Sequence, residues 1–291
     1  MIHIKNLTKS YGKKVALENL SLDIKKGSIF GLLGVNGAGK TTLLSILNGL
    51  IDFESGVVEI DGLDIKKSKK EIKSLSSIIP QHLAFYENLS VKENLDFFAS
   101  VQYATKEDYA KAIQINSLET LLEQKASTLS GGQKRRLNIA IGLLNNPKII
   151  YFDEPTVGID PQSRNEILDS IKAYKKYGIT VIYTSHYMTE IEKICDEVAI
   201  INKGQVVEQD TLENLLSNKV SNKVMVECIY HHTLKELSFD FLEETIISTT
   251  QENLCEVIDT LQSYAIPIKQ IRYGSTNLEK HFLEVTGEQN V

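Results

Sequence analysis

The feature that most constrains this chain is a glycine-rich segment, Gly34-Val35-Asn36-Gly37-Ala38-Gly39-Lys40-Thr41, which satisfies the pattern GxxxxGK[ST]. A short apolar run precedes it at residues 28–33, and apolar residues at helical spacing follow it over residues 40–47. A glycine-rich turn between a strand and a helix lets backbone N–H groups surround a phosphate, and the helix N-terminus adds the positive end of its dipole. We therefore predict a nucleotide site to which Asn36, Gly37, Ala38, Gly39 and Thr42 contribute. The Lys40 amine should reach the β- and γ-phosphates, and the Thr41 hydroxyl should ligate Mg²⁺. This pattern alone does not choose among kinases, GTPases and ATPases.

A pair of adjacent acids gives a second part of the site. The apolar run Ile149-Ile150-Tyr151-Phe152 leads directly into Asp153 and Glu154. Ligands of a parallel sheet bind at the carboxyl ends of its strands, which is where this pair falls. We predict that Asp153 holds Mg²⁺, directly or through water, and that Glu154 accepts a proton from the attacking water.

Composition sets limits on the class of protein. The chain has 291 residues and a formal net charge of −6, so its overall charge gives no reason to expect nucleic-acid binding. It contains no apolar run of about 18 residues, and its first residues do not resemble a signal peptide, so we expect a cytosolic protein. The three cysteines have no metal-like spacing. The basic runs at 66–70 and 134–136 are expected to be solvated faces, although a partner-binding patch stays open.

Apolar patterning predicts an α/β architecture. The first 25 residues alternate between apolar and polar side chains and indicate antiparallel strands, whereas residues 148–152 and 179–183 are typical of buried parallel strands. Helical patterns dominate from about 82 to 146, where Ser90-Val91-Lys92-Glu93 fits a capping box. We predict a domain over residues 1–217 with a helical subdomain at 82–146, followed by a small accessory α/β domain over residues 218–291.

Another segment, Leu129-Ser130-Gly131-Gly132-Gln133, lies about ninety residues after Lys40. Ser130 and Gln133 have the spacing of a capping box, and a helix N-terminus with two glycines is also a site for an anion. With this segment the chain resembles the ABC ATPase family, whose signature is LSGGQ. Other family elements follow in the expected order: Tyr11, Gln81, Gly158-Ile159-Asp160-Pro161 and His186. Two departures are Val35, where proline is common, and Ile159, where leucine is usual.

The resemblance covers residues 1–217 and implies a P-loop NTPase fold: a RecA-like parallel-sheet core, an antiparallel β subdomain and an inserted helical subdomain. It implies that Tyr11 stacks on the adenine of ATP, that Gln81 contacts Mg²⁺ and the attacking water, and that His186 contacts the γ-phosphate. It also implies a head-to-tail pair of ATPase subunits, in which Ser130, Gly131, Gly132 and Gln133 of one subunit meet the ATP held by the other. Asp160 then lies in the loop that crosses the dimer interface.

Spacing favours a transport subunit within this family. Ninety residues between Lys40 and Ser130 leave no room for the long coiled coil of the DNA-repair and chromosome-structure ATPases. The chain also has one phosphate loop, whereas translation-associated members carry two cassettes. The ending at 277–287 resembles that of ATPases that drive bacterial exporters of drugs, antibiotics, peptides and polysaccharides, although it also fits a packing helix. We expect a peripheral protein on the cytoplasmic face of the plasma membrane, bound to an integral membrane permease, without nucleic acid. The transported substrate, and the choice between two copies and a pair with a paralogue, stay open. The alternative is a soluble ABC ATPase acting on a cytosolic assembly.

Overall fold

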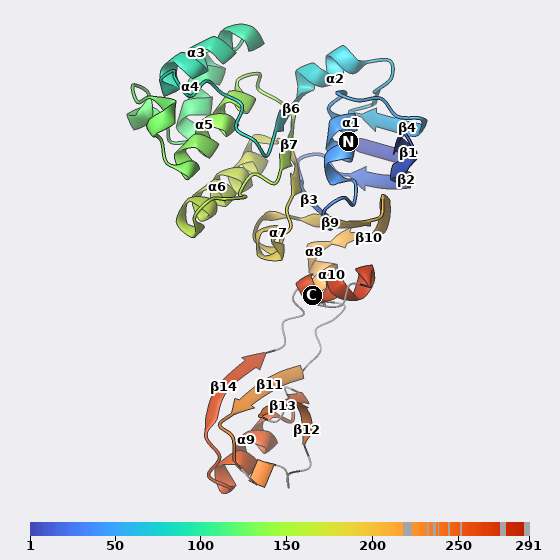
Figure 1. The fold of residues 1–291 in the computed structure, drawn as a ribbon, viewed down its shortest axis with the longest axis vertical. Helices are drawn as coiled ribbons and strands as arrows, with labels where there is room; N and C mark the ends of the chain where they lie inside the picture. The colour runs from blue at the N-terminus through green and yellow to red at the C-terminus, as the bar shows by residue number, and fades with distance from the viewer. Residues whose placement is uncertain are drawn as a thin grey trace. The chain divides into compact units, whose positions relative to one another are not determined.

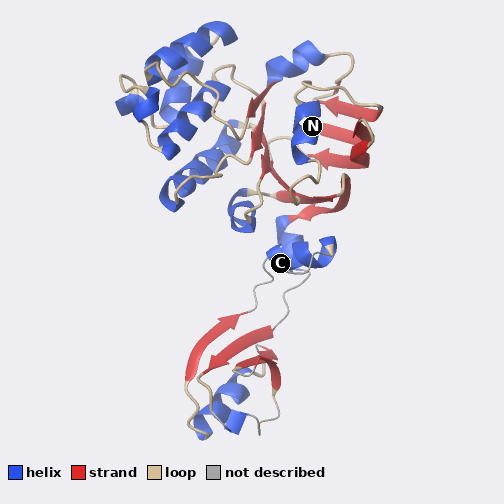
Figure 2. Ribbon diagram, in the orientation of Figure 1, coloured by secondary structure: helices blue, strands red, loops and turns tan. Residues whose placement is uncertain are grey.

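The computed structural model describes residues 1–217, 223–231, 233–234, 237, 239–243, 245–250, 252–273 and 278–287 (Figures 1 and 2). The chain divides into two compact units, Met1–Leu212 and Glu213–Val291. The domain boundary placed at 217/218 from the sequence meets residues 218–222, outside the described ones, and stays a prediction. In the described residues, no helix combines the length and the apolar character that crossing a membrane requires.

An antiparallel sheet forms the N-terminal part of the first unit. Its strands follow the order β2-β1-β4-β5. Their bounds are β1 (Ile2–Tyr11), β2 (Lys14–Ile24), β4 (Ser55–Ile60) and β5 (Leu63–Asp64). Along β1 and β2, buried apolar residues alternate with exposed polar ones over much of their length, because successive side chains of a strand point to opposite faces. This confirms the antiparallel strands predicted for the N-terminus.

The second sheet of this unit is mostly parallel. Its strands follow the order β10-β9-β3-β8-β7-β6, and only β10 runs antiparallel to its neighbour. Their bounds are β3 (Ile29–Leu33), β6 (Ser76–Ile79), β7 (Ile149–Asp153), β8 (Thr180–Thr184), β9 (Glu197–Asn202) and β10 (Gln205–Thr211). Every residue of β3 and β8 is buried, as expected for strands covered on both faces. The predicted α/β fold with a parallel core is confirmed.

Helices connect and cover these strands. Their bounds in the first unit are α1 (Lys40–Leu47), α2 (Lys69–Leu75), α3 (Val91–Gln102), α4 (Lys106–Ile115), α5 (Gly131–Leu143), α6 (Pro161–Tyr174) and α7 (Met188–Ile194), with 3₁₀ turns at Glu119–Leu121, Ala126–Thr128 and Lys175–Tyr177. Helix α1 lies between the two sheets (Figure 1). Its Leu43, Leu44 and Leu47 side chains join residues of both sheets in one core. This packing fixes the start of α1 against the end of β3, and with it the glycine-rich segment at residues 34–41, called the phosphate loop below.

A helical block of α3, α4 and α5 stands beside the parallel sheet (Figure 2). Both capping boxes predicted in this region are present: Ser90 and Glu93 cap α3, and Ser130 and Gln133 cap α5. Each box satisfies two backbone donors that a helix start leaves open. The beginning of α5 is therefore set by its own sequence.

The second unit contains a four-stranded antiparallel sheet in the order β12-β13-β11-β14. Its elements are α8 (Leu212–Ser217, beginning at the end of the first unit), β11 (Lys223–Cys228), β12 (Asp240–Glu243), β13 (Ile246–Thr250), α9 (Leu254–Ser263), β14 (Ile268–Tyr273) and α10 (Leu278–Thr286). Val226, Ile247 and Leu261 are fully buried where α9 packs on the sheet. The helix predicted at the C-terminal end is present as α10, with Leu278 and Phe282 buried. Asn277, the first residue of that ending, lies outside the described residues.

Candidate functional site

The phosphate loop joins the buried end of β3 to the first turn of α1. Two of its glycines are required by their surroundings. A Cβ on Gly34 would lie 2.5 Å from the Ile201 carbonyl oxygen, and Gly39 has a φ of +109° and would bring a Cβ to 2.6 Å from the Ala16 carbonyl oxygen. Backbone therefore approaches backbone on both sides of the loop, which only glycine allows.

Lys40 lies inside this loop with 6% of its surface exposed. Its ammonium donates to the carbonyl oxygens of Gly34 at 2.6 Å and Val35 at 3.3 Å. Burial lowers the pKa of Lys40, while the nearby carboxylates of Glu154 and Asp153 act in the opposite direction. The Val35 carbonyl accepts hydrogen bonds from Lys40 and from the Ala38 N–H, and its side chain packs against the core, so these hydrogen bonds form without the proline that is common at this position.

The acidic pair follows β7 and faces the phosphate loop. The Thr41 hydroxyl donates to Asp153, at 3.0 Å from Oδ2 and 3.3 Å from Oδ1. The Thr184 hydroxyl, at the end of β8, lies 3.1 Å from Asp153 Oδ1 and accepts the Glu154 N–H at 3.0 Å. These contacts join the ends of two neighbouring strands.

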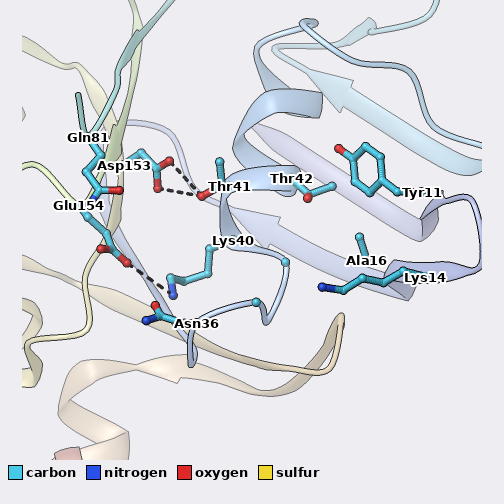
Figure 3. A pocket seen from close by; sticks show the side chains of 12 residues that line it. Tyr11, Lys14, Ala16, Asn36, Lys40, Thr41, Thr42, Gln81, Asp153 and Glu154 are labelled. Carbon is cyan, nitrogen blue, oxygen red and sulfur yellow. Dashed lines mark hydrogen bonds and ion pairs between the residues drawn. The ribbon is translucent and has the colours of Figure 1, made fainter. Parts of the chain in front are cut away.

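The donors around Asp153 fit a magnesium ion. Mg²⁺ prefers oxygen ligands and is usually held by one or two protein groups together with phosphate and water. Asp153, Thr41 and Gln81 offer a carboxylate, a hydroxyl and an amide at one end of a shared cavity (Figure 3). Among the described residues no group of three or more His, Cys, Asp or Glu is placed to enclose a metal by itself. The chemistry therefore fits an ion that phosphate helps to hold.

Glu154 stands between a cation and a histidine. One carboxylate oxygen lies 3.8 Å from Lys40 Nζ, and the other lies 3.4 Å from His186 Nδ1. Its φ is +47°, an unusual conformation for a residue with a side chain. Such strain costs on the order of 1 kcal/mol and is often found at functional sites. A carboxylate held beside an imidazole is suited to orient water and accept its proton.

A cavity of about 400 Å³ is lined by Lys40 and Glu154, whereas His186 lies outside its lining. Tyr11 lies at one end, Gln81, Asp153 and Glu154 lie at the other, and the phosphate loop lies between them (Figure 3). Its lining contains these predicted residues: Tyr11, Asn36, Gly37, Gly39, Lys40, Thr41, Thr42, Gln81, Asp153 and Glu154. Ala38 is buried behind the loop. The arrangement offers an aromatic surface at one end and charge at the other, as a nucleoside triphosphate requires.

Two lining residues escaped the sequence analysis, Lys14 and Ala16. Both lie in β2, and Lys14 is paired directly with Tyr11 across the hairpin. The turn at Gly12 was visible in the sequence, and a pairing drawn outward from it would have placed Lys14 beside Tyr11.

The remaining predicted residues lie outside this cavity's lining. Ser130 and Gly131 are exposed at the start of α5, where the Ser130 hydroxyl accepts the Gln133 N–H and the Gln133 side chain accepts the Ser130 N–H. Asp160 caps α6 by accepting the Ser163 N–H, and this hydrogen bond lowers the pKa of the Asp160 carboxyl. Gly132 is buried against α6.

The basic run 134–136 does not form a solvated face as expected, because Arg135 is only 3% exposed. Its guanidinium donates to the carbonyl oxygens of Pro80 at 2.8 Å and Gln81 at 2.6 Å. Asn138, one turn further along α5, accepts the Ala84 N–H. The segment that carries Gln81 is thus hydrogen-bonded to α5, and burial lowers the pKa of Arg135.

Known proteins resemble this chain in sequence and in structure. A family model described as "ABC transporter" matches residues 17–157. The linearmycin resistance ATP-binding protein of Bacillus subtilis is 35% identical over 99% of this chain and 98% of its own length. The lantibiotic transport ATP-binding protein of Streptococcus pyogenes is 34% identical over 78% of this chain and 99% of its own.

The solved structures that resemble this chain include ATP-binding cassettes, as the sequence relatives do. An ATP-binding cassette solved as a dimer in a post-hydrolysis state with ADP and phosphate has a TM-score of 0.65 and 27% identity, covering 73% of this chain and 99% of that chain. Part of an ABC transporter complex from Clostridium perfringens has a TM-score of 0.69 and 28% identity, covering 75% of this chain and 91% of that chain.

Proposed function

The chain belongs to the ABC transporter family as an ATP-binding subunit with ATPase chemistry, and from this premise we propose that it drives a bacterial exporter through a separate membrane permease. The single observation that carries the ATPase part of this proposal is the convergence of Lys40, Thr41, Asp153 and Glu154 on one cavity that also contains Tyr11. The proposed cargo class is peptides, antibiotics or other amphipathic compounds. The printed names of the relatives, which include linearmycin resistance and lantibiotic transport, support that class.

In the proposed mechanism the cavity binds ATP along its length. Tyr11 stacks on adenine at one end, and the phosphates lie against the backbone N–H groups of the phosphate loop. The Lys40 ammonium exchanges its two carbonyl acceptors for phosphate oxygens. Mg²⁺, when bound at Thr41 and Asp153 with Gln81 nearby, would neutralise charge that develops on the phosphates.

Hydrolysis is assigned to Glu154 and His186. In this proposal Glu154 orients water and accepts its proton, and His186, whose Nδ1 lies 3.4 Å from the Glu154 carboxylate, contacts the γ-phosphate. Positioning and electrostatic stabilisation then supply most of the rate, as in other phosphoryl transfers.

A second ATPase subunit completes the site in this proposal. The exposed start of α5 is a helix N-terminus, which attracts anions, and it lies outside the lining of this chain's own cavity. Ser130, Gly131, Gly132 and Gln133 therefore meet the γ-phosphate held by the partner, and the segment containing Asp160 crosses the interface. Loss of the γ-phosphate removes the bridging charge and lets the pair open.

The permease is proposed to dock on the helical block. Tyr86 and Phe97 are 51% and 44% exposed, and their rings meet at 5.2 Å in an edge-to-face contact. The same chain segment continues back to Gln81, whose carbonyl Arg135 holds. A movement of the permease against Tyr86 and Phe97 would thereby displace Gln81.

Two experiments test the proposal. Glu154→Gln should bind ATP but hydrolyse it at least about 100-fold more slowly, because the amide cannot accept the proton. The variant should therefore accumulate as an ATP-bound dimer. Unchanged turnover would remove Glu154 from this role. Affinity purification from detergent-solubilised native membranes should recover a polytopic membrane protein in stoichiometric amount. Recovery with only a cytosolic assembly would favour the alternative, a soluble ATPase that acts on that assembly.

A further inference from the structure

A buried glutamate outside the nucleotide cavity connects the two loops that carry Glu154 and His186. Glu190 lies in α7 with 2% of its surface exposed. Its Oε1 accepts the Thr156 hydroxyl at 2.7 Å. Its Oε2 accepts the hydroxyls of Tyr183 at 2.9 Å and Ser185 at 2.7 Å.

The donors come from segments next to the reacting groups. Thr156 follows Glu154 by two residues, and Ser185 directly precedes His186. The Ser185 oxygen also accepts the Tyr187 N–H at 2.9 Å, which fixes the turn around His186. Glu190 thus contacts the loop after β7 through one oxygen and the end of β8 through the other.

Arg164 in α6 adds a third segment. Its Nε lies 3.5 Å from Glu190 Oε1, and its NH2 group donates to the Ile159 carbonyl oxygen at 3.3 Å. Its guanidinium lies over the Tyr187 ring at 4.6 Å, and that ring is 4.2 Å from the imidazole of His186. The loop before Asp160 and the turn around His186 are therefore joined through one ion pair.

We propose that Glu190 is a positioning residue for hydrolysis, because its carboxylate sets the turn that carries His186 against the loop that carries Glu154. The inference rests on the proposed function of those two residues. A carboxylate has acceptor sites on both oxygens, and three hydroxyl donors use both of them here. A glutamine has one acceptor oxygen and one N–H₂ group, so on one side the hydroxyls can no longer donate and must turn to accept, and the negative charge that faces Arg164 is lost.

The test compares Glu190→Gln with Glu197→Gln in the full-length protein. Glu197, on β9, is a buried acid of the same type at 7% exposure that pairs with Lys25 instead. Misplacement of a reacting group by about 1 Å can cost about 100-fold, so we expect kcat of Glu190→Gln to fall by about 10- to 100-fold. The affinity for a fluorescent ATP analogue should stay within about twofold in both variants, and Glu197→Gln should keep its kcat.

A double variant separates positioning from general loss of structure. If Glu190 acts through His186, adding Glu190→Gln to His186→Ala should lower kcat by less than about threefold, because the group it positions is already gone. If Glu190→Gln does not fold, Ser185→Ala removes one of the three donors to Glu190, together with the acceptor of the Tyr187 N–H, and should lower kcat by about 3- to 10-fold at unchanged nucleotide affinity.

The opposing outcomes are distinct. Wild-type kcat in Glu190→Gln, or an equal loss in both backgrounds, overturns the positioning role while the proposed function stands. Wild-type kcat in Glu154→Gln removes Glu154 from its proposed role, and the inference, which rests on that role, falls with it.

Discussion

The contact between Gly132 and Ser163 makes a quantitative prediction about the start of α5. A Cβ added to Gly132 would lie 2.4 Å from both the Cβ and the Oγ of Ser163, and 3.7 Å from its Cα. Rotating the serine side chain moves only Oγ, so the contact between the two Cβ atoms persists. Gly132→Ala therefore requires the starts of α5 and α6 to move apart.

The expected cost follows from two opposing effects. Overpacking of this kind costs about 1–3 kcal/mol, and a clash with a Cβ atom belongs to the upper part of that range. Replacing glycine by alanine in a helix returns up to about 1 kcal/mol. The net loss should be about 1–2 kcal/mol, which lowers the melting temperature by about 2–8 °C in a domain of this size.

Thermal unfolding followed by circular dichroism measures this loss, and two controls isolate its cause. Gly131→Ala places its Cβ 3.6 Å from Ile159 Cδ1, an ordinary contact, and should leave the melting temperature unchanged or slightly higher. In a Ser163→Gly background the clashing atoms are absent, so Gly132→Ala should no longer destabilise the protein. An equal loss in both backgrounds would refute the steric reasoning.

Three further predictions concern nucleotide binding and closure. Lys40→Ala should weaken ATP binding severalfold or more in a fluorescence titration, because the variant lacks the buried ammonium that we expect to bind the phosphate oxygens. Wild-type affinity would contradict the phosphate site. Ser130→Arg should leave ATP binding by the monomer intact but prevent the ATP-bound dimer on size exclusion; loss of monomer binding would point to a purely structural cap. Arg135→Met should cost about 1–3 kcal/mol of stability and lower turnover, because the Gln81 carbonyl loses its donor. Arg136→Met, at the partly exposed neighbour, should do neither, and equal melting temperatures of the two variants would exclude a stabilising role for the Arg135 hydrogen bonds.

Much of the site could be predicted because its residues follow strands. A buried apolar run before Gly34 and another before Asp153 are local signals, and parallel strands bring their carboxyl ends to one edge. The capping boxes at Ser90 and Ser130 were equally local, since each depends on two residues three positions apart.

The supporting residues could not be predicted in the same way, because their roles depend on tertiary contacts. Arg135 stands in a basic run that is typical of a solvated helix face, and only the position of the segment at 80–81 makes it a buried donor. Glu190 looks like any acid in an amphipathic helix, and its three hydroxyl partners come from two other parts of the chain. A single sequence shows which side chains can form such bonds but not which elements meet.

The groups that we propose for hydrolysis are held by two different parts of the fold. Asp153 and Glu154 are hydrogen-bonded to Thr184 at the end of β8, the strand that leads to His186, so these groups are held together by the parallel sheet. Gln81 belongs to the other part, because its carbonyl is tied to α5 in the helical block. A small movement of the helical block relative to the sheet would displace Gln81 while Asp153, Glu154 and His186 kept their places. Under the proposed function, the rate of ATP hydrolysis then depends on the position of the helical block as well as on whether ATP is bound.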